Sequence, residues 1–144
     1  MKIRKNLPNY LVFGFFAVAG GLWLAQSNGP RTVAGNQIIV KIPQLTAQAA
    51  EGKKAFDSTC GQCHGLNGAG TDKGPPLVHD IYNPGHHADE AFFVATRFGV
   101  RQHHWPFGDM PAQAQVPKEE IVKIVRYVRE LQAANAIVYR EHRM

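Results

Sequence analysis

The chain has 144 residues, 44% of them hydrophobic, and a net charge of +5, so it can hold one domain and a short additional segment. Lys2, Arg4 and Lys5 supply three of those positive charges, and all 11 acidic residues lie after Ser27. The rest of the chain is therefore close to neutral. It shows no basic stripe with interleaved aromatic residues, which argues against nucleic acid binding.

The first 27 residues have the pattern of a membrane or export segment. The three basic residues precede an uncharged apolar run at 10–25, and extending the run back to residue 7 brings it close to the ~20 residues that span a bilayer. We predict a retained anchor at residues 1–27, because the run is longer than the core of a typical signal peptide. The tripeptide at 25–27 also resembles a cleavage site, so a signal peptide is the alternative. In either interpretation the chain after residue 27 is exported across the membrane, and the basic N-terminal end stays in the cytoplasm.

Residues 28–44 are predicted to be a linker. Gly, Pro and Asn surround one apolar run, Ile38–Ile42, which predicts a short extended element. This element could pack on the following domain as an edge strand or contact a partner, and packing is favoured.

A helix is predicted from Thr46 to Cys60, at the start of a domain that covers residues 45–144. Gly52, Phe56 and Cys60 recur every four residues and therefore share one face of this helix. A glycine inside a helix costs about 1 kcal/mol relative to alanine, unless another element must approach closely. The Gly52 face is thus either a close helix contact or a tolerated weak position.

The two cysteines of the chain follow, in the sequence CGQCHG that starts at Cys60. Three interpretations compete for the Cys60-x-x-Cys63-His64 motif. A redox dithiol should open a helix within a βαβ pattern, and no strand run precedes Cys60. A structural zinc site needs four ligands, and the second cysteine pair is missing, although histidines at 86, 87, 103 and 104 could complete one. Covalent attachment of a c-type haem is favoured, because C-x-x-C-H is its signature.

Two further helices are predicted later in the chain. The first covers His87–Gly99, with acidic residues near its start and a glycine at its end. The second covers Pro117–Asn135, with Glu119 and Glu120 in its first turn. Its apolar stripe consists of Ile121, Ile124, Val125, Val128 and Leu131.

The domain resembles the class I cytochromes c. The matching residues are Gly52, Phe56, Cys60, Cys63 and His64, then GPPL at 74–77, DMP at 109–111, and Ile124 with Tyr127 in the last helix. The resemblance covers about residues 45–131. It implies a small all-α domain around one covalent haem c, in which the first and last helices cross near Gly52, Phe56 and Tyr127.

The resemblance also implies roles for residues of the loop at 65–77. Pro75 would offer its backbone carbonyl to the free ring N–H of His64, the proximal ligand, and Leu77 would pack on the haem. A metal-bound imidazole usually donates its other N–H to such an acceptor, which fixes the orientation of the ring. A Pro-Pro turn without this role is the alternative.

Met110 is the predicted second axial ligand of the iron. It is the only internal methionine, it lies in a Gly/Pro loop, and a thioether ligand raises the haem potential. His103 or His104 is the alternative ligand. Trp105 could donate its indole N–H to a haem propionate, although aromatic packing explains it equally well. The histidine pairs at 86–87 and 103–104 also permit a copper or zinc site, but surface histidines are the plainer interpretation.

Two protein ligands would leave the iron no open position, so the sequence predicts an electron carrier and not an enzyme. We expect it to pass electrons between a redox protein donor and acceptor of a bacterial respiratory chain, at the periplasmic face of the inner membrane. It would be a soluble periplasmic protein if the N-terminal segment were cleaved. A haem subunit of a larger oxidoreductase is one alternative. A five-coordinate haem enzyme or gas sensor is the other, if Met110 is not a ligand.

Overall fold

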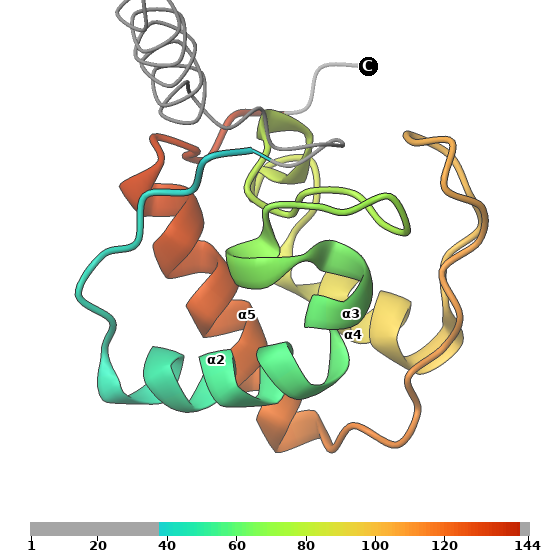
Figure 1. Ribbon diagram of the computed structural model, residues 1–144, viewed down its shortest axis with the longest axis horizontal. Helices are drawn as coiled ribbons and strands as arrows, with labels where there is room; N and C mark the ends of the chain where they lie inside the picture. The colour runs from blue at the N-terminus through green and yellow to red at the C-terminus, as the bar shows by residue number, and fades with distance from the viewer. Residues whose placement is uncertain (1–37, 142–144) are drawn as a thin grey trace, which may run out of the picture. The chain divides into compact units, whose positions relative to one another are not determined.

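The computed structural model describes residues 38–141, so the anchor predicted at 1–27 and residues 28–37 of the predicted linker lie outside it. Figure 1 shows its elements, which are α2 (Ala47–Thr59), α3 (Gly61–His64), two 3₁₀ turns at Leu66–Gly68 and Asp80–Tyr82, α4 (Asp89–Phe98) and α5 (Lys118–Ala134). Within 38–141 there is no strand, only an isolated bridge between Val100 and Met110, which confirms the predicted all-α fold. None of these helices has the length and apolar character needed to cross a bilayer.

The helices begin and end close to the predicted residues, and their caps explain why. The Thr46 side chain accepts a hydrogen bond of 3.3 Å from the Ala49 N–H, which satisfies one free donor at the start of α2. α5 begins at Lys118, one residue later than predicted, with Pro117 at the N-cap position and two glutamates in the first turn. α4 is two residues shorter at its start than predicted, and Gly99 ends it.

The crossing of α2 and α5 forms the centre of the domain (Figure 1). A Cβ atom at Gly52 would lie 1.9 Å from the Lys123 carbonyl oxygen, so only glycine lets α5 approach this closely. Phe56 and Tyr127 meet edge to face with ring centroids 5.5 Å apart, and both side chains are fully buried. The close-contact interpretation of Gly52 is therefore correct.

A buried hydrogen bond ties this helix pair to the loop after α3. The Tyr127 hydroxyl donates to Asn67 Oδ1 over 2.8 Å, and burial raises the pKa of Tyr127, so the hydroxyl stays a donor at neutral pH. We expect Tyr127→Phe to lower the free energy of unfolding by about 1–3 kcal/mol, because the buried Asn67 oxygen loses its partner. Urea unfolding measures this loss. Tyr139→Phe is the control, since Tyr139 is 69% exposed; equal stabilities of the two variants would contradict the assignment.

The extended segment predicted at Ile38–Ile42 packs on the domain, but not as an edge strand. The Ile38 N–H donates a hydrogen bond of 3.0 Å to the Ala69 backbone carbonyl. The Lys41 backbone N–H donates to the Asn135 side-chain oxygen, and the Asn135 side-chain nitrogen donates back to the Lys41 carbonyl. Ile38 and Val40 pack against the core, whereas Ile39 is 92% exposed. The edge-strand prediction is wrong because the described chain supplies no neighbouring strand to pair with.

Candidate cofactor site

The C-x-x-C-H segment is held in place by the end of α2 and the single turn of α3. The Cys60 N–H donates to the Phe56 carbonyl over 2.8 Å, which continues the bonding of α2. The Cys63 and His64 N–H groups both turn back to the Cys60 carbonyl, at 3.1 and 2.9 Å. This tight turn brings both thiols and the imidazole to one wall of a cavity.

The cavity has a volume of about 610 Å³, which is within the range of 300–1,000 Å³ typical of cofactor and ligand sites. It lies between the C-x-x-C-H segment, α4, the loop that follows α4, and the first turns of α5. Its walls are mostly apolar, and they include Phe56, Leu77, Phe92, Val100, Ile121 and Ile124. Such a cavity excludes water from a bound group and accepts a large, flat, apolar one.

The Cys60 thiol does not have the lowered pKa of a reactive cysteine. Both cysteines are free, and Cys60 is partly buried while Cys63 is exposed. Burial, with a smaller effect of neighbouring Cys63, raises the pKa of Cys60 to about 11. Redox-active cysteines instead have lowered pKa values, because the thiolate is the reactive form. Cys60 is therefore not the attacking thiolate that a dithiol redox pair would need.

His64 is oriented by the loop at 65–77. Its Nδ1 lies 2.9 Å from the Pro75 carbonyl oxygen, so Nδ1–H donates and Nε2 keeps a free lone pair. Burial lowers the pKa of His64, the Pro75 bond opposes this change, and the net shift favours the neutral imidazole that binds metals. Gly74 permits the contact, since a Cβ there would lie 2.8 Å from the Cys63 carbonyl oxygen.

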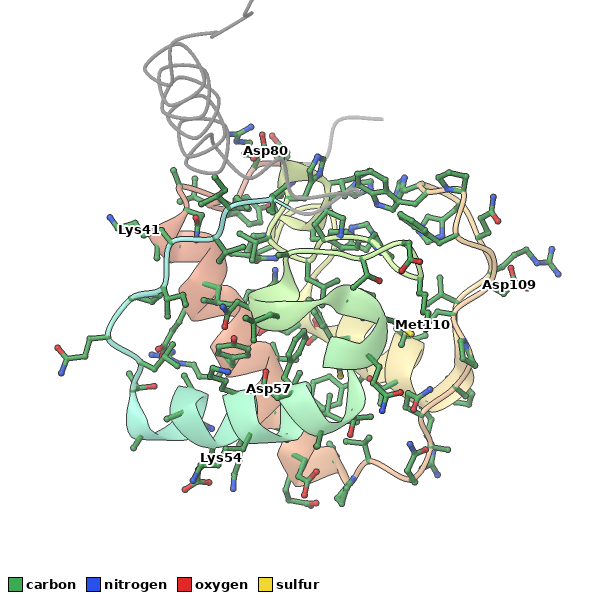
Figure 2. All side chains as sticks on the ribbon, viewed as in Figure 1. Lys41, Lys54, Asp57, Asp80, Asp109 and Met110 are labelled. Carbon is green, nitrogen blue, oxygen red and sulfur yellow. The ribbon has the colours of Figure 1, made fainter. Side chains whose placement is uncertain are left out.

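Met110 lines the same cavity as His64, on the loop that connects α4 to α5. Val100 and Met110 exchange two backbone hydrogen bonds of 2.9 Å, which close this loop at its base. Figure 2 shows the Met110 side chain pointing from the loop toward the helices. The structure thus brings an imidazole and a thioether to one cavity.

Leu77 and Trp105 also line the cavity. Leu77 is 8% exposed, and its carbonyl accepts a hydrogen bond of 2.9 Å from Gln132 Nε2, which fixes the loop on α5. The Trp105 ring meets His79 edge to face at 5.1 Å, and its buried Nε1–H has no hydrogen-bond partner. A buried donor without an acceptor is costly, by about 1–3 kcal/mol. A carboxylate of a bound group would satisfy it.

The cavity wall also contains Tyr82, which the sequence analysis did not single out, and three of the histidines that it considered as possible metal ligands. These are His87, His103 and His104, although surface histidines were the plainer interpretation of the pairs. Burial raises the pKa of Tyr82 to about 12, and the nearby Trp105 indole has a smaller opposite effect, although its N–H makes no hydrogen bond of normal geometry. The signal in the sequence was a pair of adjacent histidines on each side of a short helix. The sequence alone does not show that the two pairs come together, because this depends on the fold.

The residues present fit a haem with two thioether links. The thiols of Cys60 and Cys63 form no disulfide, and Nε2 of His64 is available to bind a metal. The Met110 thioether lines the same cavity, and the Trp105 indole N–H has no hydrogen-bond acceptor. The cysteines do not fit the zinc interpretation, because the one gathering of three or more potential metal ligands within residues 38–141 contains neither of them.

One comparison with known proteins gave a match, to the family model described as cytochrome c, over residues 49–132. The matched range is more than half of the chain and includes most of α2, the C-x-x-C-H segment, the cavity and most of α5. No curated protein and no solved structure matched.

Proposed function

The chain belongs to the cytochrome c family, whose covalently attached c-type haem transfers electrons, and on this basis we propose that His64 and Met110 are the two axial ligands of its iron. The observation that carries the proposal is that both side chains line one cavity while the Pro75 carbonyl holds His64 with Nε2 available. When bound, the haem supplies a one-electron couple. The order of the motifs supports membership of class I.

The residues of the chain have three tasks in this proposal. The thiols of Cys60 and Cys63 hold the cofactor permanently, so that it is not lost during repeated oxidation and reduction. The apolar walls, with Leu77 among them, keep water away, and the Met110 thioether favours the reduced state. Trp105 would donate its unpaired N–H to a carboxylate at the edge of the cofactor.

An electron carrier must exchange electrons with partner proteins. We propose redox proteins of a bacterial respiratory chain as partners, at the periplasmic face of the inner membrane. The support is the basic start and apolar run of residues 1–27, which lie outside the described part of the chain.

A redox titration of the purified holoprotein tests the carrier function. We expect a reversible one-electron transition, and slow uptake of carbon monoxide by the reduced protein, because a protein ligand must leave the iron first. Stopped-flow mixing with carbon monoxide measures the second property. Rapid uptake, or turnover of peroxide, would contradict the carrier function and favour a haem enzyme or gas sensor.

A further inference from the structure

Three histidines from two separate segments converge in one group, and two of them, His87 and His104, also line the cavity. His86 and His87 lie in the turn before α4, and His104 lies in the loop after it. One ligand nitrogen from each ring lies within 4.8 Å of the others, and His86 Nε2 is 3.2 Å from His104 Nε2. His104 is exposed and the other two are partly buried, so an ion could reach the group from solvent.

The spacing of these nitrogens suits a transition-metal ion. Zinc–imidazole bonds of 2.0–2.1 Å at tetrahedral angles separate two ligand nitrogens by about 3.3 Å. The His86–His104 pair already has about this separation, at 3.2 Å, and the His87 ligand nitrogen lies within 4.8 Å of both.

The backbone around the group holds one of the ligands ready. His87 Nδ1 lies 2.8 Å from the Ile81 carbonyl oxygen, so Nδ1–H donates and Nε2 is left for a metal. The turn itself is fixed by Asn83, whose carbonyl accepts from the His86 and His87 N–H groups at 3.0 and 2.9 Å. Arg129 of α5 adds a hydrogen bond of 2.5 Å to the His87 carbonyl.

We propose that His86, His87 and His104 form a binding site for a divalent copper or zinc ion, separate from the haem iron. Imidazole donors suit both ions, whereas magnesium and calcium prefer oxygen ligands. Three protein ligands leave room for water as a fourth. His103 is outside the group, although its ring centroid is 4.2 Å from that of His104, and its Nδ1 bonds the Arg101 carbonyl instead.

Metal titration of the holoprotein tests the site. The haem is kept oxidised, so that Cu²⁺ finds no electron to accept, and endogenous metal is first removed with a chelator that is then dialysed away. Calorimetry with ZnCl₂, and in a second arm with CuCl₂, should show one bound equivalent, while MgCl₂ should show none. The two arms decide which ion binds more tightly; the affinity order of nitrogen sites favours copper.

Two variants and a matched control make the test specific. His86→Gln and His104→Gln should each weaken binding by about tenfold or more, with an unchanged far-ultraviolet circular dichroism spectrum as the check on folding. His103→Gln removes an adjacent imidazole and should leave the affinity within about twofold of wild type, as expected for a residue that ligates nothing. Absence of a stoichiometric equivalent, or equal affinities of wild type, His86→Gln and His104→Gln, would overturn the proposal.

Discussion

Met110→Ala should convert the protein from one that takes up carbon monoxide slowly to one that takes it up rapidly, and should lower its midpoint potential. Removal of the thioether opens one axial position, so carbon monoxide can bind without the prior dissociation of a protein ligand. A thioether also favours ferrous iron, and a tenfold loss of that preference lowers a one-electron potential by about 59 mV. We therefore expect a fall of roughly 60 mV or more, measured by redox titration beside stopped-flow gas binding.

His103→Ala is the matched control for this experiment. His103 belongs to the same loop and lines the same cavity, but its Nδ1 is engaged with the Arg101 carbonyl over 2.8 Å. We expect the midpoint potential and the carbon monoxide binding rate of the His103→Ala variant to remain close to those of the wild type. If Met110→Ala were unchanged while His103→Ala lost its low-spin spectrum, the axial role would pass to the histidine.

Gly52→Ala should destabilise the folded domain by about 3 kcal/mol, the upper end of the range for overpacked cores. The added Cβ would lie 1.9 Å from the Lys123 carbonyl oxygen and 2.3 Å from its carbon. These atoms belong to the backbone of α5, so no side-chain rotation relieves the clash and the two helices must separate. Urea unfolding followed by circular dichroism measures the change.

Gly61→Ala is the control for the helix crossing. A Cβ at Gly61 would have the Phe56 carbonyl oxygen as its nearest neighbour at 3.6 Å, an ordinary contact. Because alanine reduces the freedom of the unfolded chain, this variant should be as stable as the wild type or more stable by about 0.4–1 kcal/mol. Equal stability of both alanine variants would show that α2 and α5 do not depend on close contact at Gly52.

The helices were predictable because their signals are local. Thr46 caps α2, Pro117 precedes α5, and the predicted apolar stripe of α5 is the stripe that is buried. The segment Ile38–Ile42 packs on the domain as predicted, but its prediction as an edge strand was wrong, because an apolar run does not determine the partners of its backbone hydrogen bonds. Its actual partners, Ala69 and Asn135, are far away in the sequence.

The candidate site also has one part that was predictable from local sequence and another part that was not. Cys60, Cys63 and His64 lie within five residues, so one turn of helix suffices to bring them together. The sequence also gave Met110, Leu77 and Trp105 as candidates, but only the fold places them at one cavity. The convergence of His86, His87 and His104 was not predictable, because it depends on the turn at Asn83 and on the path of the loop after α4.

The bridge between Val100 and Met110 has a consequence for how the domain opens. Residues 100–110 form an Ω-like excursion whose ends are joined by two backbone hydrogen bonds, and most of its side chains are exposed. The excursion also contacts the rest of the domain through the Trp105 and His79 rings and through His104 and His86. None of these contacts belongs to the α2–α5 crossing, so we expect the excursion to unfold locally at a lower free energy than the whole domain. The Met110 side of the cavity can thus open while the side attached through Cys60 and Cys63 stays folded.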